Sequence, residues 1–482
     1  MELLRIAPVA DELADRFVAA GHELYLVGGS VRDALLGRFR SGAHGTDLDF
    51  TTDARPDQTQ AILTDWADAV WDTGIAFGTV GAAKAGTTCE VTTYRAERYD
   101  RVSRNPEVVF GDSLDGDLLR RDFTINAMAV QLPVRDPGQW ESGQWESDQW
   151  GRRFIDPYGG RAALARRELD TPATPPESFA DDPLRMLRAA RFVSQLGFTL
   201  APRVHAAMVD MAGEIRRIAA ERVQAELSKL LLGPHSRRGV ELLVDTGLAE
   251  HVLPEVPAMR LEIDEHHQHK DVYSHSLTVL DQAIALESGE PDLVLRLAAL
   301  LHDIGKPATR RHEAGGGVSF HHHEVVGAKM ARTRLRALRY SKDTVSDVTQ
   351  LVFLHLRFHG YGRGEWTDSA VRRYATDAGD LLPRLHKLVR ADCTTRNRRK
   401  AAALQHSYDD LEARIERIRA EEDLARVRPD LDGNTIMELL GIPPGPLVGT
   451  AWRFLKELRM DRGPLTREEA EAELLRWWSS RA

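Results

Sequence analysis

Hydrophobic and polar residues follow two different patterns along the chain. Over residues 23–132, short β-rich runs such as 25–27, 48–50 and 90–95 alternate with stretches at helical spacing. From residue 181 onward β-branched runs become scarce and apolar residues recur at helical spacing, with breaks at glycine and proline. The pattern predicts an α+β fold, in which a head with a mixed sheet is followed by an all-helical remainder.

Breaks in this pattern divide the chain into expected domains. Its 482 residues correspond to about three domains at roughly 150 residues each. A Pro- and Thr-rich hinge at 170–176 and a proline-rich break at 443–446 interrupt the helical spacing. We expect a head over residues 1–160, a helical neck and body over 161–260, a histidine-rich domain over 261–400 and a helical tail over 401–482. The Trp-rich near-repeat at 139–150 is expected to be a loop insertion.

Composition and charge narrow the class of protein. Hydrophobic residues make up 42% and charged residues 28%, which excludes disordered, collagen-like and disulfide-scaffold proteins. With 64 Lys and Arg against 73 Asp and Glu, the net charge of -9 argues against coating nucleic acid through bulk charge but permits a local basic surface. Two groups of cations are candidates for contact with RNA: Arg332, Arg334, Arg336 and Arg339, and the denser group Arg396, Arg398, Arg399 and Lys400.

The cysteines and the start of the chain indicate the compartment. Cys89 and Cys393 are too few and too far apart for a disulfide framework, so a reducing compartment fits. The first 22 residues carry acidic side chains and do not resemble a signal peptide. Since no run approaches the roughly 18 apolar residues of a membrane span, we expect a cytoplasmic protein without a membrane partner.

A glycine turn near the N-terminus could bind phosphate. The apolar strand that begins at Leu26 turns through Gly28 and Gly29 into a helix. The glycines let backbone N–H groups approach a phosphate, and Arg32 in the first helical turn can complete the clamp. Taken alone the turn is weak evidence, because many strand-to-helix turns need glycine only for geometry.

Paired carboxylates follow on the next strand. Asp47 and Asp49 alternate with Leu48 and Phe50, so both carboxylates face the same side of the strand. This arrangement suits two Mg2+ ions in phosphoryl transfer, whereas an ordinary exposed strand would leave two like charges unpaired. Glu90 is a possible third carboxylate, and a solvent-facing strand residue is an equal alternative.

Two further segments combine arginine with acidic residues. Arg121 and Asp122 begin the run Arg-Asp-Phe-Thr-Ile-Asn, in which Arg121 could contact a triphosphate. After Asp182 and Pro183 the cations recur at a spacing of three, at Arg185, Arg188 and Arg191. On composition alone, both segments are more typical of a solvated helix face than of a site.

Together these motifs carry a family resemblance. Gly-Gly-Ser-Val-Arg-Asp, Asp-Leu-Asp-Phe, Arg-Arg-Asp-Phe-Thr-Ile-Asn-Ala-Met, Ile-Asp-Pro-Tyr-Gly-Gly, Asp-Asp-Pro-Leu-Arg-Met-Leu-Arg-Ala-Ala-Arg-Phe and Glu-Arg-Val-Gln-Ala-Glu occur in this order. The chain thus resembles the class II CCA-adding tRNA nucleotidyltransferases and bacterial poly(A) polymerases. The resemblance implies a DNA polymerase β-like nucleotidyltransferase head, and a plan of head, neck, body and tail.

The resemblance also implies roles for the motif residues. Asp47 and Asp49 would bind Mg2+, and Asp182 with Arg185 would read the incoming base. The triphosphate would be held by Gly29, Arg32 and Arg121, in the turn that Gly28 begins. Arg188 and Arg191 would assist, either by phosphate contact or by supporting the base-reading pair. CTP and ATP both present an amino donor beside a ring-nitrogen acceptor, so one carboxylate and one guanidinium accept both and reject UTP and GTP. The switch from C to A is assigned to a mobile loop, for which residues 97–117 are the candidate.

Histidines and aspartates on separate helical segments form a second constellation. Their order resembles the HD phosphohydrolase superfamily, and His302-Asp303 after an apolar helix is its strongest part. Imidazoles and carboxylates from several helices can hold a divalent metal that activates water. The predicted ligands are His275, His302, Asp303 and Asp392. Among His321, His322, His323, His355 and His359, the choice for a second metal falls on His323 and His355.

Three functions compete at this point. The first is the addition of CCA to tRNA 3' ends from CTP and ATP, the second is poly(A) addition by the same head, and the third is an HD-type phosphohydrolase with a dormant head. Intact Asp47 and Asp49 count against the third. The motifs do not separate the first two, and CCA addition is preferred.

Overall fold

The computed structural model describes most of the chain, and it comprises two compact units. The described residues are 7–38, 47–75, 78–94, 110–111, 113–132, 154–260, 271–313, 317–358, 361, 366–395, 397–422 and 429–480. The first unit contains Met1–Arg222 with Arg238–His251, and the second contains Val223–Arg237 with Val252–Ala482. The Trp-rich insertion at 139–150, His359 and Arg396 lie outside the described residues. The finer division into four domains stays a prediction.

A mixed sheet forms the centre of the head. Its seven strands follow the order β3-β4-β5-β2-β1-β6-β7. Only β2 and β5 pair in parallel, and the other neighbours are antiparallel. The strands are β1 (Leu24–Val27), β2 (Asp47–Thr52), β3 (Ala69–Trp71), β4 (Thr79–Lys84), β5 (Thr87–Thr93), β6 (Ala129–Leu132) and β7 (Phe154–Ile155).

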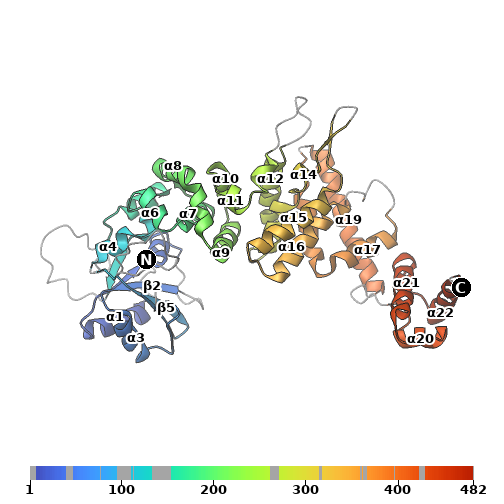
Figure 1. The fold of residues 1–482 in the computed structure, drawn as a ribbon, viewed down its shortest axis with the longest axis horizontal. Coiled ribbons are helices and arrows are strands. Elements are labelled where there is room, and N and C mark those ends of the chain that lie inside the picture. The colour runs from blue at the N-terminus through green and yellow to red at the C-terminus, as the bar shows by residue number, and fades with distance from the viewer. Residues whose placement is uncertain are drawn as a thin grey trace. The chain divides into compact units, whose positions relative to one another are not determined.

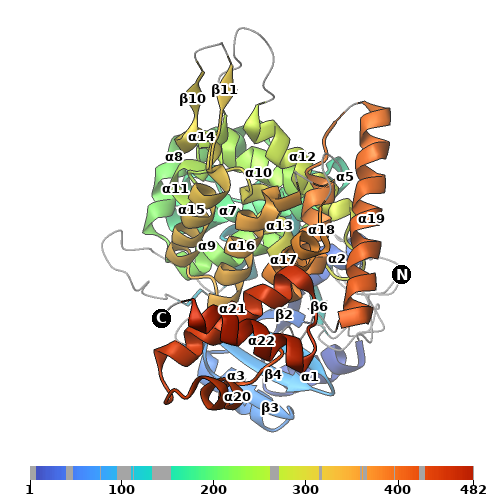
Figure 2. The same ribbon diagram turned by 90° about the vertical axis from the view of Figure 1, so that its right-hand side faces the viewer.

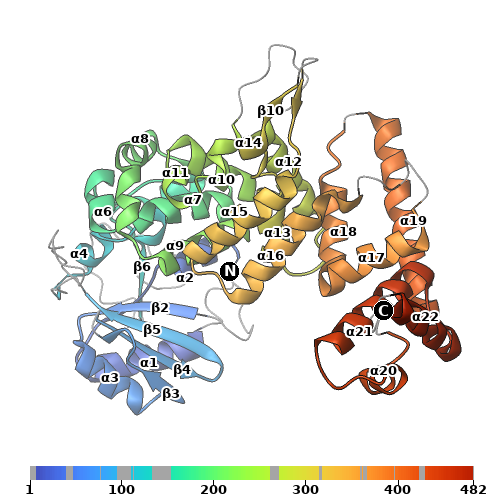
Figure 3. The ribbon, with the colours of Figure 1, turned by 45° about the vertical axis from the view of Figure 1, so that its right-hand side comes forward.

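Helices cover the sheet and build the rest of the first unit. α1 (Ala7–Ala19) and α3 (Pro56–Thr64) lie on the same side of the sheet (Figure 3). Leu48 and Phe50, which alternate with the two aspartates on β2, are buried. The remaining helices of the unit are α2 (Gly29–Leu35), α4 (Leu114–Leu119), α5 (Gly160–Arg166), α6 (Pro175–Asp181), α7 (Leu184–Leu196), α8 (Pro202–Met211) and parts of α9 (Ala220–Leu231), α10 (Ser236–Asp245) and α11 (Ala249–Val252).

The second unit is almost entirely helical (Figure 1). Its main helices are α12 (Val272–Ala285), α13 (Leu293–Leu301), α14 (Lys306–Thr309), α15 (His323–Ala337), α16 (Lys342–Leu354), α17 (Asp368–Ala378), α18 (Leu382–Ala391), α19 (Arg398–Glu422), α20 (Gly433–Leu440), α21 (Pro446–Arg462) and α22 (Arg467–Ser479). A short hairpin of β10 (Arg311–His312) and β11 (Val318–Ser319) projects from these helices, while α20, α21 and α22 pack around a small core of their own (Figure 2).

The predicted fold class is confirmed, since a head with a mixed sheet precedes a mainly helical remainder. One local prediction is wrong at its C-terminal end. The last residues of the candidate mobile loop at 97–117 form the start of α4, where Asp117 is buried, and the rest of the loop stays a prediction. Residues 97–109 and 112 lie outside the described residues. Within the described part of the chain, no helix has the length and apolar character that a membrane span requires.

Candidate functional site

Three carboxylates lie close together on one face of the head sheet. β2 and β5 are parallel, and their register places Asp49 directly beside Glu90, with Asp47 two residues earlier on β2. Burial raises the pKa of Asp49, Arg121 opposes this rise, and Asp47 adds to it. Burial and the charges of Asp49 and Asp47 likewise raise the pKa of Glu90. Like charges held this close favour a bound cation, and carboxylate oxygens are the ligands that Mg2+ prefers.

The glycine turn brings an arginine next to these carboxylates. β1 ends at Val27, and Gly28 adopts a left-handed φ of 71° before α2 begins. A Cβ atom at Gly28 would lie 3.3 Å from both Nη1 of Arg121 and Oδ2 of Asp49. The Ser30 hydroxyl donates to the backbone carbonyl of Asp47 at 3.2 Å. Glycine at position 28 therefore serves both the turn and the close approach of Arg121 to Asp49.

Arg32 belongs to a hydrogen-bond network that joins three sequence motifs. Its guanidinium donates to both carboxylate oxygens of Asp33, at 2.7 and 2.8 Å, and to Oδ1 of Asn126 at 2.8 Å. Asn126 donates to Asp122 at 2.9 Å, and Asp122 forms an ion pair with Arg188 at 2.6 Å. Burial acts to raise the pKa of Asp122, but Arg188 and Asn126 lower it to about 2. The network fixes Arg32 beside the carboxylates through residues 94 positions away.

Arg121 is held by an aspartate that sequence analysis placed in a loop. Its Nη2 donates to Oδ2 of Asp117 at 3.1 Å, and Asp117 also accepts from Thr51 at 3.3 Å. The Nε of Arg121 is buried and forms no hydrogen bond with any described residue. The sequence contains one weak signal for this contact. Asp117 and Arg121 are four residues apart, which is the spacing of a helical ion pair.

The predicted base-reading residues lie in the first unit, where each has other partners. Asp182 accepts from the backbone of Leu184 at 3.1 Å and from Arg222 at 2.9 Å. Arg185 donates to the Ser178 hydroxyl at 2.8 Å and to the backbone carbonyl of Arg120 at 2.6 Å. The Arg191 guanidinium lies over the Phe192 ring, 4.4 Å from its centroid. The sequence motif containing Arg222 was recognised, but its ion pair with Asp182 was not predicted.

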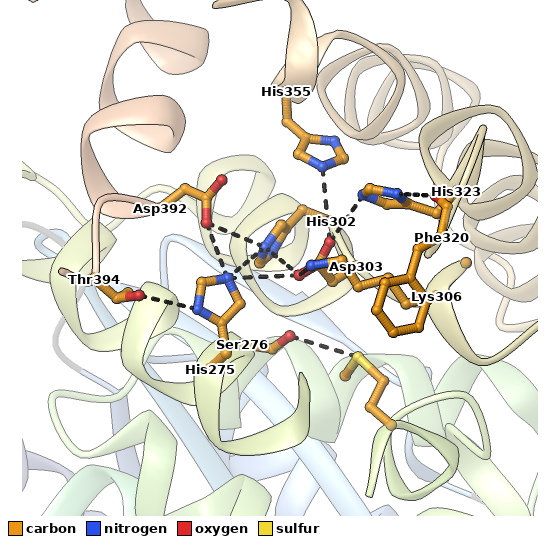
Figure 4. Close-up of polar contacts among 12 residues, drawn as sticks. His275, Ser276, His302, Asp303, Lys306, Phe320, His323, His355, Asp392 and Thr394 are labelled. Atoms are coloured by element: carbon orange, nitrogen blue, oxygen red, sulfur yellow. Dashed lines mark hydrogen bonds and ion pairs between the residues drawn. The ribbon is translucent and has the colours of Figure 1, made fainter. Parts of the chain in front are cut away.

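Six side chains of the second unit converge on one centre (Figure 4). They form two groups whose ligand atoms lie within 4.8 Å of one another: His275, His302 and Asp392, and Asp303, His323 and His355. Asp303 joins the groups. Its Oδ2 lies 3.5 Å from Nε2 of His275 and 3.2 Å from Nε2 of His302, while its Oδ1 lies 3.2 Å from Nε2 of His323.

Backbone carbonyls orient three of the histidines. Nδ1 of His302 lies 2.8 Å from the carbonyl oxygen of Ala299, and the same contact links His323 to Phe320 at 2.8 Å. Nδ1 of His355 lies 2.7 Å from the carbonyl oxygen of Val352. Each contact requires the proton on Nδ1 and so leaves the Nε2 lone pair directed at the centre, as in metal-binding histidines.

The chemistry of this donor set fits divalent cations. His302, Asp303 and His355 are almost fully buried, and the Nε2 atoms of His323 and His355 form no hydrogen bond with any described residue. Burial lowers the pKa of His355 to about 3, with help from His302, so its imidazole is neutral and can ligate. Lys306 donates to Oδ2 of Asp303 at 2.6 Å and is the nearest cation to the centre among the described residues.

The choice among the remaining histidines agrees with this arrangement. His323 and His355 join Asp303, whereas His321 and His322 are exposed, with side chains 71% and 82% accessible. Among the candidate RNA-facing cations, Arg334 forms an ion pair with Glu255 at 2.9 Å, which would have to break for Arg334 to bind RNA. The other group, at Arg398, Arg399 and Lys400, is exposed at the start of α19.

Comparison with known proteins identifies three domains along the chain. The domain described as Poly A polymerase head domain matches residues 24–170. The domain described as Probable RNA and SrmB- binding site of polymerase A matches 197–259, and the HD domain matches 272–397. The head thus defines a nucleotidyltransferase that carries an HD domain.

Individual relatives extend the likeness. The A-adding tRNA nucleotidyltransferase of Deinococcus radiodurans is 35% identical over 378 residues, which are 76% of this chain and 80% of the relative. The CCA-adding enzyme of Anoxybacillus flavithermus is 41% identical over 244 residues, but the match spans only 54% of its length. The crystal structure of Bacillus stearothermophilus CCA-adding enzyme in complex with CTP covers 99% of this chain and 98% of that one, at 27% identity and a TM-score of 0.67. The chain belongs to the family of tRNA nucleotidyltransferases and bacterial poly(A) polymerases.

Proposed function

We propose that this protein adds CCA to the 3' end of tRNA from CTP and ATP without a template and releases pyrophosphate. The observation that carries the proposal is the position of Asp47, Asp49 and Glu90 on one sheet face beside Arg121. The carboxylates can hold a cation, and Arg121 beside them can bind a triphosphate. The names of the CCA-adding relatives, and the CTP complex of one of them, support the choice of substrates.

Mg2+ fits the carboxylates of the head. Asp47 and Asp49 would hold it, and Glu90 is positioned to assist. When bound, Mg2+ supplies positive charge that favours attack by the tRNA 3'-hydroxyl and departure of pyrophosphate. Arg121 and Arg32 would contact the triphosphate, and their fixed positions reduce the reorganisation needed when charge develops.

Asp182 and Arg185 would select the base. The carboxylate accepts a hydrogen bond from the amino group of cytosine or adenine, and the guanidinium donates to the adjacent ring nitrogen. Both side chains must exchange their present partners, Arg222 and the Arg120 carbonyl, for the base.

A second candidate is the addition of the terminal A alone. The A-adding relative matches 76% of this chain, whereas the CCA-adding enzyme of Anoxybacillus flavithermus matches 50%. Poly(A) addition uses the same head chemistry and remains a third product to test. Transfer reactions with CTP alone, ATP alone and both together separate the three, because only CCA addition consumes CTP and only poly(A) addition builds long tails from ATP alone.

The HD centre would bind two divalent cations. Group one would use His275, His302 and Asp392, and group two would use His323 and His355, with Asp303 shared between them. Bound cations would supply a nucleophilic water for phosphate-ester hydrolysis. Release of phosphate from 2',3'-cyclic and 2'-phosphate substrates with Mg2+, Mn2+, Ni2+ and Co2+ in turn tests this activity, and no turnover with any of them would refute it.

A further inference from the structure

Two glycines of the second unit lie backbone to backbone beside the group of Asp303, His323 and His355. Gly305 follows Asp303 by two residues, and Gly327 follows His323 by four. A Cβ atom added to Gly305 would overlap the carbonyl oxygen of His323 and lie 2.7 Å from the Gly327 nitrogen. One added to Gly327 would lie 3.2 Å from the Gly305 nitrogen. The turn that carries Asp303 therefore meets the start of α15 at these glycines.

Backbone conformation does not explain either glycine. Gly305 has φ of -77° and ψ of -18°, which any residue adopts. Gly327 lies inside α15, where glycine stabilises a helix less than alanine does. The close approach of the two backbones is thus the physical reason for both.

A third segment meets the same contact. The added Cβ atom of Gly327 would lie 3.5 Å from Cγ1 of Val352, on α16. Val352 also supplies the carbonyl that holds Nδ1 of His355. Gly327 therefore touches the segments that position Asp303 and His355, and its own helix carries His323. The other ligands, His275, His302 and Asp392, come from α12 and the ends of α13 and α18.

We propose that Gly327 is a positioning residue for the cation held by Asp303, His323 and His355. This inference rests on the proposed two-cation HD centre. A methyl group at 3.2 Å forces its neighbours apart by a few tenths of an ångström. Metal-ligand distances tolerate only about 0.2 Å, so such a shift displaces His323 from a shared cation. A substitution at Gly305 would move Asp303, which is shared by both groups of ligands. A substitution at Gly327 is therefore the more selective change for the group that contains His323 and His355.

Mn2+ binding tests the proposal, measured by calorimetry and by electron paramagnetic resonance on the full chain. Every chain in the series, the wild-type reference included, also carries Asp49→Ala, because the carboxylates of the head are themselves a proposed cation site. The reference is expected to bind two ions at the HD centre with a spin-coupled signal. Gly327→Ala is expected to keep its affinity for the first ion within about twofold and to lose about tenfold or more for the second, a size typical of residues that orient ligands. The spin-coupled signal is expected to disappear in Gly327→Ala, as in His323→Ala. The Tm of metal-free Gly327→Ala is expected not to fall below that of the metal-free wild type.

The controls separate this result from general damage. Gly449→Ala, with nothing within 4 Å of the added Cβ atom, is expected to bind both ions like the wild type. Val352→Leu crowds the same contact from α16 and provides a second variant with the same expected loss. Wild-type affinity for both ions in Gly327→Ala, or equal weakening of both, would overturn the positioning role. A wild type that binds fewer than two ions would instead refute the two-cation centre itself.

Discussion

Asp49 and Glu90 are direct neighbours on the parallel strands β2 and β5, 41 residues apart in sequence. Desolvation and the charge of Asp49 raise the pKa of Glu90, and a bound cation would offset the repulsion between the two carboxylates. Glu90 is therefore a candidate third carboxylate of the transfer site. Glu90 is also exposed on β5, so its two alternatives, a third carboxylate and a solvent-facing strand residue, both stay predictions.

Removing these carboxylates should stop nucleotide transfer in a graded way. Asp49→Asn is expected to lower kcat for nucleotide incorporation by about 100-fold or more, because the amide would no longer hold the cation that neutralises the negative charge developing in the transition state. Glu90→Gln is expected to cause a smaller loss, and Asp57→Asn, an exposed change on α3, should cause none. Unaltered activity of Asp49→Asn would exclude it as a cation ligand.

Acid should weaken the head through Asp122. The pKa of its carboxyl group is about 2, below the ordinary 3.8, because Arg188 and Asn126 outweigh burial. A lowered pKa stabilises the fold above about pH 4, and this contribution of about 2 kcal/mol is lost as the pH falls toward 2. Asp122→Asn should therefore lose stability at pH 7 and should lose less than the wild type on acidification. Urea unfolding, with hydrogen exchange to follow the head, measures both, and an identical acid response of the two proteins would contradict the assignment.

The HD centre should lose its cations according to which group is changed. Asp303→Asn is expected to remove both ions, since its two oxygens face different histidines. Asp392→Asn should remove only the ion of group one. Asp281→Asn, whose partner is Arg237, is the control and should retain both. Metal content after desalting, measured on chains that also carry Asp49→Ala to remove the head site, gives the result, and two ions in Asp303→Asn would show that Asp303 does not bridge them.

Neutralising the cations at the start of α19 should reduce the salt dependence of tRNA binding. Arg398 and Arg399 are exposed, and each phosphate contact contributes about one unit to the slope of log affinity against log salt. The double change Arg398→Ala with Arg399→Ala is expected to lower the slope by about two. Arg467→Ala, on the tail helix and paired with Glu471, should leave it unchanged. A wild-type slope in the double variant would remove these residues from the RNA surface.

Sequence patterns predicted those parts of the candidate sites whose geometry depends on local spacing. Asp47 and Asp49 share a face because a strand alternates, and the His302-Asp303 pair follows an apolar helix that packs in the core. Asp117 was misplaced because its polar neighbours favour a loop, whereas Thr51 and Arg121 hold it inside the structure. The pairing of Arg334 with Glu255, 79 residues away, depends on packing that no local pattern contains.

The most direct measurement is the 3' sequence that the protein builds on three tRNA transcripts, which lack CCA, end in CC or end in CCA. With CTP and ATP together, the account predicts CCA on the first, a single A on the second and no addition to the third. CTP alone should add two residues to the first transcript. CCA addition would be contradicted if the transcript ending in CC gained an A while the transcript lacking CCA gained nothing. Long A tails from ATP alone would also contradict it.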